Sequence, residues 1–178
     1  MKSGQHGIKI IAWLLLGLML TACGFQLTGN EKLPQPLQDV YINVSETPHS
    51  TIAPDLISAL QSHQVHCVKN PTLAHILLNI TQDAASSQQI GSGASQETRQ
   101  YQLNYTVTFT LITAAGKVIT GPVTVTSSKI HYVYSGQVLG NNEEEETLYR
   151  GLRRDVVQKI LFSLSSAAVV AALTPPVS

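Results

Sequence analysis

The chain has 178 residues, 43% of them hydrophobic and only 12% charged, and its eleven Lys/Arg balance its eleven Asp/Glu. This balance excludes the extended basic surface with which nucleic-acid-binding proteins attract phosphates, so no nucleic-acid partner is expected. The length suits one domain that buries roughly two thirds of the surface its unfolded chain exposes.

The N-terminus has the pattern of a bacterial lipoprotein signal. Two lysines precede an apolar run over residues 10–20, which leads into Leu20-Thr21-Ala22-Cys23. The run is shorter than the about 20 apolar residues that cross a bilayer, and it has the length and flanks of a signal-peptide core. Small residues suit peptidase cleavage, and a Cys at the new terminus can carry a diacylglyceryl group. We expect a signal peptide over residues 1–22 and lipid attachment, including palmitate, at Cys23.

Processing at this site would change the charge and the thiol count. Loss of Lys2 and Lys9 would leave nine Lys/Arg against eleven Asp/Glu, a formal charge of −2. With Cys23 acylated, Cys67 is the one remaining thiol, so no intramolecular disulfide is expected. Gly24 stands where an Asp commonly directs retention at the inner membrane, which indicates the outer membrane. Two or three acyl chains, at about 0.8 kcal/mol per buried CH₂, would anchor the protein there.

A tether, a strand and a helix are expected next. Residues 23–38 contain two prolines and are typical of a tether from the lipid to the domain. Residues 40–44 alternate apolar and polar side chains, as in a half-buried strand. Ile52, Leu56, Ile57 and Leu60 then recur at helical spacing. Ser50 or Thr51 is the candidate N-cap, and the helix is expected to end near His63.

Three strands are expected to follow. Residues 76–81 form the first and run through polar residues into a loop over 88–96, while residues 101–111 show the clearest alternation in the chain. A hairpin over 114–117 leads to a last strand with Val123 and Val125 inward. Beyond Ser127-Ser128 the apolar positions shift by one residue, which predicts a bulge or a change of face.

The last element is a long amphipathic helix. Asn141-Asn142 are its expected cap, and Glu143 to Glu146 would fill the first turn, where carboxylates favour the helix dipole. An apolar stripe runs from Leu148 to Leu164, and residues 167–178 are expected to be a helix end with a loose tail. The element order predicts a single α+β domain over 39–166, a two-layer sandwich with two helices on one face of a mixed four-stranded sheet. The other face is rich in Thr, Asn and Gln and nearly uncharged.

No catalytic or metal constellation is recognisable in the sequence. His63, His66, Cys67 and His75 are close together but lack the spacing of four converging zinc ligands, so loop histidines and a sheltered thiol are favoured. Asp83 and Glu97 flank the Gly91–Gly93 loop without a feature that would make them an acid–base pair. We therefore expect a non-enzyme with no metal and no cofactor other than the lipid on Cys23.

Five cations are candidates for an anionic ligand. Arg150, Arg153 and Arg154 cluster on the last helix, where a solvated helix face is favoured over an anion site. Arg99 and Lys129 are isolated cations on an otherwise uncharged sheet. An external phosphate or carboxylate would suit them, although two surface charges with no ligand is the simpler alternative.

Several segments resemble a known family. They are Leu20 to Leu27 with Gly29, Val40-Tyr41-Ile42, Tyr101-Gln102-Leu103, Val123 to Ser128 with the aromatic stretch after it, and the acidic start of the last helix. In this order they resemble the LptE family of lipopolysaccharide-assembly lipoproteins. The resemblance implies two helices on a four-stranded sheet and a plug inside the LptD β-barrel that supports lipopolysaccharide transport to the outer leaflet. It also implies basic residues that bind lipopolysaccharide, for which Arg99 and Lys129 are the closest positional candidates.

The resemblance implies a protein that is lipid-anchored at the outer membrane, with its domain on the periplasmic side and within the barrel lumen. Two alternatives remain open. One is a stand-alone envelope lipoprotein that binds a glycan or a lipid. The other is a hydrolase, which would need a nucleophile or an acid–base pair that the sequence does not display.

Overall fold

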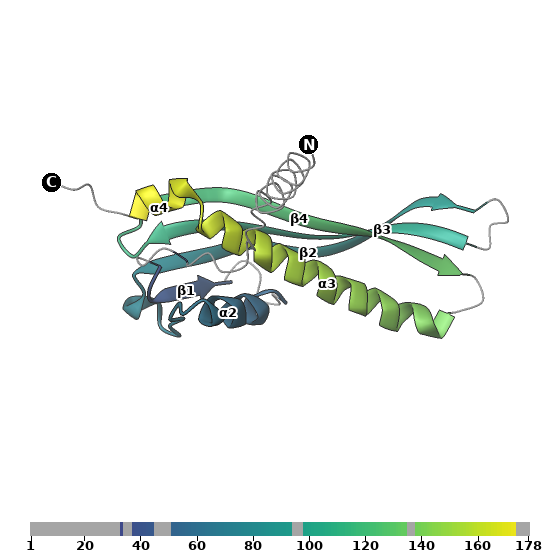
Figure 1. The fold of residues 1–178 in the computed structure, drawn as a ribbon, viewed down its shortest axis with the longest axis horizontal. Helices are drawn as coiled ribbons and strands as arrows, with labels where there is room; N and C mark the ends of the chain where they lie inside the picture. The colour runs from purple at the N-terminus through teal and green to yellow at the C-terminus, as the bar shows by residue number, and fades with distance from the viewer. Residues whose placement is uncertain (1–32, 34–36, 45–50, 94–97, 135–137, 174–178) are drawn as a thin grey trace, which may run out of the picture. The chain divides into compact units, whose positions relative to one another are not determined.

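The computed structural model describes residue 33 and residues 37–44, 51–93, 98–134 and 138–173. The chain divides into two compact units, Met1–Glu31 and Lys32–Ser178. The first unit lies outside the described residues, and with it the expected signal peptide and Cys23. The second unit contains, in chain order, β1 (Val40–Asn43), α2 (Ala53–Ser62), a 3₁₀ turn η1 (Pro71–Leu73), β2 (Ile76–Ser92), β3 (Thr98–Thr113), β4 (Val118–Tyr134), α3 (Val138–Leu164) and α4 (Ala167–Leu173) (Figure 1).

The four strands form one mixed sheet in the order β1-β2-β3-β4. β1 pairs with β2 in parallel, and the other two pairs are antiparallel, so the sheet is mixed, as the sequence predicts. Because β1 pairs only with Ile76 to Asn79, the rest of the sheet is three-stranded. Strands of 16 and 17 residues, at about 3.3 Å per residue, make this sheet roughly 50 Å long. We call the end that carries Ser92, Thr98 and Tyr134 the distal end.

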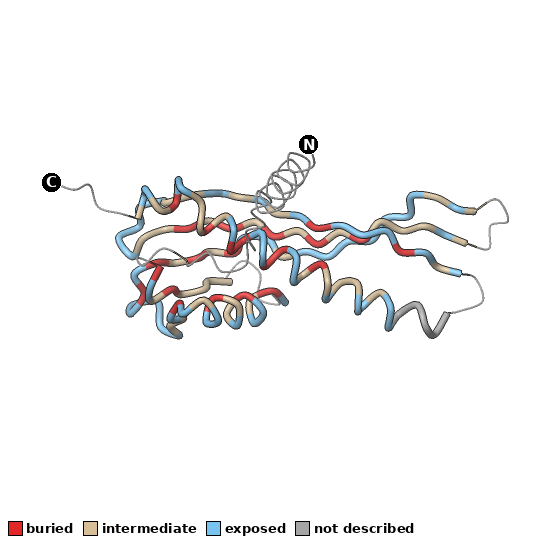
Figure 2. Tube along the Cα trace, in the orientation of Figure 1, coloured by how far each residue is buried: buried red, intermediate tan, exposed pale blue. Residues whose placement is uncertain are grey.

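Helices α2 and α3 cover one face of the sheet and bury its apolar side chains (Figure 2). The alternation in β3 is realised fully: its odd-numbered residues from Leu103 to Leu111 are at most 2% exposed. The helices contribute stripes at i+4 spacing, which place their apolar side chains on one side. The stripe residues that are fully buried are Leu56, Leu60, Leu152, Val156, Ile160 and Leu164. The predicted two-layer α+β architecture is confirmed.

The apolar shift in β4 is a change of face and not a bulge. The β3–β4 register is continuous from Phe109 opposite Val123 to Thr98 opposite Tyr134. Ser127 and His131 keep the buried phase beneath α3, whereas the apolar side chains after them point away from the helices. The side chains of Ile130, Tyr132 and Tyr134 are therefore 52%, 47% and 53% exposed.

Both helix starts differ from the sequence prediction. The N-cap of α2 is Ile52, and no side chain caps the helix. Helix α3 begins at Val138 and so includes Asn141 and Asn142. The helix tolerates them because the free-energy cost of Asn inside a helix is only slightly larger than that of other polar residues. The acidic run Glu143–Glu146 consequently follows the first turn and gains less from the helix dipole.

Both ends of the predicted domain are packed more fully than the sequence suggests. Leu37 is 1% exposed and Leu33 packs on the core, so the last part of the expected tether belongs to the folded unit. A third helix, α4, follows α3 at a bend of 52° and buries Val169. Within the described ranges no single helix is long and apolar enough to span a membrane; the bent pair α3–α4 meets that criterion by length and composition.

Candidate functional site

The sheet face opposite the helices, which we call the open face, carries a ladder of neutral hydrogen bonds. The hydroxyls of Thr106 and Thr126 are 3.0 Å apart, and those of Thr108 and Thr124 are 2.9 Å apart. Thr108 also lies 3.0 Å from the side-chain oxygen of Gln82. The strand register adds further members of this face: Ala84, Ser86 and Gln88 on β2, Gln100, Gln102, Asn104 and Thr110 on β3, and Ser128, Ile130, Tyr132 and Tyr134 on β4.

None of these open-face residues is charged, although most of the face is solvent-exposed. Charged side chains, especially Lys, are one of the features by which proteins keep exposed strands from associating. Asn43 and Asn79 continue the pattern toward β1 with an amide–amide hydrogen bond of 3.1 Å. The open face is thus suited to contact another polar, neutral surface.

Arg99 and Lys129 lie on the side of the sheet that the helices occupy, and not on the open face. Arg99 is opposite Val133 and Lys129 is opposite Leu103, so the two positions are four residues apart along β3. This separation corresponds to about 13 Å. A side-chain carbon at Gly151 of α3 would lie 3.5 Å from the Lys129 amino group, so the lysine reaches van der Waals distance of the helix. Both cations are exposed near the distal end, but they do not form one pocket.

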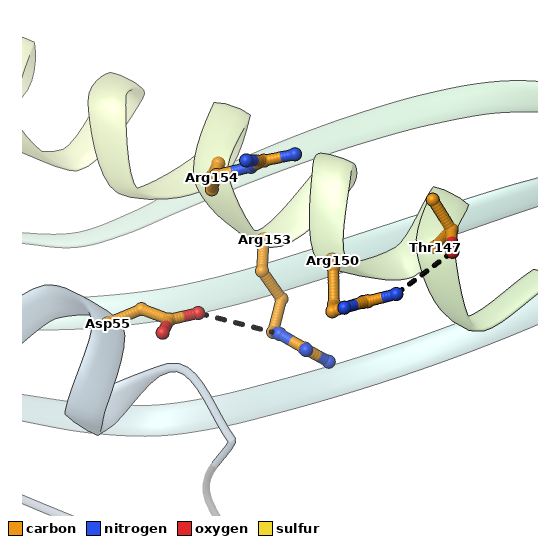
Figure 3. A pocket seen from close by; sticks show the side chains of 5 residues that line it. All are labelled: Asp55, Thr147, Arg150, Arg153 and Arg154. Carbon is orange, nitrogen blue, oxygen red and sulfur yellow. Dashed lines mark hydrogen bonds and ion pairs between the residues drawn. The ribbon is translucent and has the colours of Figure 1, made fainter.

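A cavity of about 290 Å³ lies between α2 and α3 (Figure 3). Asp55 lines it from α2, and residues three to four positions apart line it from one side of α3. These α3 residues are Thr147, Arg150, Arg153 and Arg154. Figure 3 shows Arg150 and Arg153 pointing to the same side of α3, whereas Arg154 extends away from them. With three guanidinium groups and one carboxylate, the lining has a net positive charge.

Arg153 is the most enclosed of the three arginines, with 17% of its side chain exposed. Its Nε lies 3.6 Å from Asp55 Oδ2, and one terminal nitrogen lies 3.5 Å from Glu146 Oε1. These are ion pairs at distances beyond good hydrogen bonds. The buried Nε has no hydrogen-bond acceptor within the described part of the chain. The interpretation of this cluster as a solvated helix face therefore fails for Arg153.

Two histidines share one carboxylate at the start of β1. The Nδ1 of His66 lies 2.6 Å from one Asp39 oxygen, and that of His75 lies 3.1 Å from the other. The hydrogen bond from His66 is the main cause that lowers the pKa of Asp39. Burial raises the pKa of the neighbouring Cys67 thiol. Among the side chains that the structure describes, no group of three or more His, Cys, Asp or Glu is placed to hold a metal ion.

Asp83 has a structural role that the sequence does not reveal. One of its oxygens accepts hydrogen bonds from the backbone N–H groups of Thr51 and Ile52, at 2.7 and 3.1 Å. Its other oxygen accepts from the hydroxyl of Tyr105. The carboxylate thus joins β2, β3 and the entry to α2. Glu97, which flanks the same loop as Asp83 in the sequence, lies outside the described residues.

The fold defines a class: two-layer α+β domains with helices on one face of a mixed sheet and a neutral open face on the other. Residues 37–164 match the LptE family, which is described as lipopolysaccharide-assembly. Because the match covers more than half of the chain, the protein belongs to the LptE family. A comparison with curated proteins found no match.

Three solved structures have the same fold. A solution structure of an uncharacterised lipoprotein B from Nitrosomonas europaea is similar with 25% identity and a TM-score of 0.65, covering 80% of this chain and 90% of that one. A minor lipoprotein from Acinetobacter baumannii has 19% identity, a TM-score of 0.61 and coverage of 72% and 91%. A rare lipoprotein B from Shewanella oneidensis has 16% identity, a TM-score of 0.62 and coverage of 74% and 97%. The last two similarities establish the fold alone.

Proposed function

We propose that this chain is a non-catalytic, lipid-anchored outer-membrane protein that plugs an LptD-type β-barrel and supports lipopolysaccharide transport through it. Family membership assigns the chain to lipopolysaccharide assembly. The lipoprotein names of the structural neighbours support the lipid anchor, which would be attached at Cys23 after removal of residues 1–22.

The observation that carries the plug proposal is the uncharged open face. The lumen of a large membrane barrel is polar, so a plug needs a surface that meets polar groups on all sides. Burying a charge without a partner is far more costly than burying a hydroxyl or an amide that exchanges hydrogen bonds. A face that carries Thr, Asn, Gln and Ser beside a few apolar and aromatic side chains, and no charge, can be enclosed by such a wall without leaving a charge unpaired.

The different parts of the domain would have different roles in the plug. The core encloses its apolar side chains between the sheet and its helices, so these side chains do not need the barrel for their burial. Arg99 and Lys129, near the distal end, would contact phosphate groups of lipopolysaccharide as it passes. The distal end of the sheet consists of three strands, because β1 and α2 do not reach it, and this end would extend into the pore.

An affinity purification of the full chain from detergent-solubilised outer membranes tests the proposal. We expect a very large β-barrel protein to co-purify in stoichiometric amount, and depletion of the chain to lower the yield of assembled barrel. Recovery of the chain as a free monomer, with barrel assembly unaffected by its loss, would contradict it. That result, together with retention on isolated glycan or lipid, would favour the stand-alone envelope lipoprotein.

A further inference from the structure

We infer that the cavity between α2 and α3 is a binding site for a phosphate group, held by Arg150, Arg153 and Thr147. This site is separate from Arg99 and Lys129, which lie on the sheet, and the inference does not depend on the proposed barrel partner.

The first support is that the guanidinium groups at the cavity have N–H donors that form no hydrogen bond among the described residues. Each guanidinium group carries five N–H donors. In the described structure Arg150 makes one hydrogen bond, of 2.9 Å to the Thr147 hydroxyl, and the Nε of Arg153 makes none. A buried donor without an acceptor is destabilising, and an anion in the cavity would supply the acceptor.

The second support is the charge of the cavity and the depth of its central residue. Two of its three cations point to the same side of α3 in Figure 3. Asp55 on the lining and Glu146 beside it face Arg153 at 3.6 and 3.5 Å, whereas no carboxylate of the described residues lies within ion-pair distance of Arg150 or Arg154. Since Arg153 is 83% enclosed, its charge is screened less than that of an exposed arginine. The three arginines outnumber these two carboxylates by one, so the net charge of the site is positive and favours an anion over a cation.

The third support is geometric and selects the class of anion. Arginine forks match phosphate and carboxylate oxygens in paired hydrogen bonds. Here two forks and one hydroxyl approach from successive turns of a single helix, so their donors do not lie in one plane. A tetrahedral phosphate, with three oxygens around one centre, can accept from donors in different planes, whereas a carboxylate has two oxygens in a single plane and accepts from fewer of them. The volume of about 290 Å³ accommodates a phosphate together with the first atoms of what it is attached to.

The test is a titration of the full, lipidated chain in a non-ionic detergent micelle, observed through the Nε–H NMR signals of Arg150 and Arg153. Inorganic phosphate is added at constant ionic strength set with chloride. We expect saturable shifts of both signals, and an affinity for acetate at least about tenfold lower than that for phosphate, because acetate offers fewer acceptors. Equal affinity for acetate, or shifts that chloride alone produces, would overturn the inference.

Variants separate the site from the fold. R150Q/R153Q should lose saturable phosphate binding, while K69Q/K117Q, which removes the same charge from exposed lysines elsewhere, should bind as the unaltered chain does. Because R153Q removes ion pairs to two carboxylates, R150K/R153K provides a second variant that keeps the charge. It should bind about tenfold more weakly, since lysine lacks the fork. Unchanged binding in the two arginine-replaced variants would refute the assignment.

Two further titrations identify the source of the phosphate. Glucosamine 1-phosphate represents a phosphorylated glycan, and glycerol 3-phosphate represents a lipid headgroup. Binding of either one more than about tenfold tighter than inorganic phosphate assigns the site to that source. Equal binding of all three assigns it to free phosphate.

Discussion

Asp83 on β2 and Tyr105 on β3 are joined by a hydrogen bond that fixes the segment leading into helix α2. The hydroxyl of Tyr105 donates to one carboxylate oxygen of Asp83 and lies 2.6 Å from the Thr51 hydroxyl. The other carboxylate oxygen accepts the N–H groups of Thr51 and Ile52. Burial raises the pKa of Tyr105 well above its usual range, so the hydroxyl remains a donor at all physiological pH values. The contact therefore holds the two residues directly before α2 in place, in a helix that has no side-chain cap.

Removal of this contact should weaken the fold without affecting lipopolysaccharide assembly. We expect Tyr105→Phe to lower the free energy of unfolding by about 1–2 kcal/mol and Asp83→Asn by about 1–3 kcal/mol, since each removes hydrogen bonds to or from a charged group. Because the two residues share one network, the double variant should lose about 1 kcal/mol less than the sum. Urea unfolding followed by circular dichroism measures all three. Additive losses would show that the residues act independently, and loss of function in a folded Asp83→Asn variant would revive the hydrolase hypothesis.

A charge on the open face should block association with the barrel while leaving the domain folded. Thr126→Glu places a carboxylate on an exposed position of β4, where stability should change by about 0.5 kcal/mol or less. Enclosure of that carboxylate by a barrel wall without a partner would be strongly unfavourable. Co-purification with the barrel is the measurement, and we expect it to be lost.

Thr72→Glu is the matched control for this variant. Thr72 is also an exposed threonine whose hydroxyl makes one side-chain hydrogen bond, but it lies in the turn η1, away from the open face. The control should co-purify normally. Equal loss in both variants would mean that added negative charge, and not its position, disturbs association.

Loss of Arg99 or Lys129 should weaken lipopolysaccharide binding in a salt-dependent way. Exposed ion pairs contribute about 0.2–1 kcal/mol, so Arg99→Gln and Lys129→Gln should each weaken binding by about two- to fivefold. Their separation along β3 makes the two effects additive. Binding of the full chain to lipopolysaccharide at 50 and 200 mM salt is the measurement, with Lys117→Gln as the charge-matched control. Unchanged affinity in the double variant would remove both residues from the proposed site.

The Asp39 carboxyl should titrate below its ordinary pKa of 3.8, because His66 and then His75 hydrogen-bond to its charged form. A carboxyl whose pKa is lower in the folded state stabilises the fold above the unfolded pKa. That stabilisation is lost as the pH falls from about 3.8 through the lowered value. Carboxyl carbon NMR shifts measured from pH 6 to pH 2 locate the titration. In His66→Ala the pKa should rise toward 3.8, and no rise would contradict the assigned cause.

The elements that the sequence predicts well are those whose periodicity is uninterrupted. The alternation from Tyr101 to Leu111 and the stripe from Leu152 to Leu164 each identify a buried face, because one packing surface decides every residue in them. Element starts are predicted less well. Thr51 has the residue type of an N-cap, but its hydroxyl contacts Tyr105, 54 residues away. Only the folded sheet brings such a partner close.

The two candidate sites show the same limit. Lys129 and Ile130 are neighbours in sequence on opposite faces of β4, so the apolar shift there could be assigned to a face only with the strand register known. Arg153 resembles Arg150 and Arg154 in sequence, yet it is enclosed because α2 brings Asp55 against it. Helical spacing alone predicts three exposed arginines. Packing between two helices distant in the chain creates the cavity.

Site-specific photo-crosslinking in living cells tests the central claim most directly. A photoreactive residue at Thr124, which is exposed on the open face, should give a covalent adduct with a very large β-barrel protein of the outer membrane. The same residue at Thr72 should give little or none. An adduct at Thr72 with none at Thr124, in a chain that still co-purifies with the barrel, would show that the uncharged sheet face is not the surface that the barrel contacts.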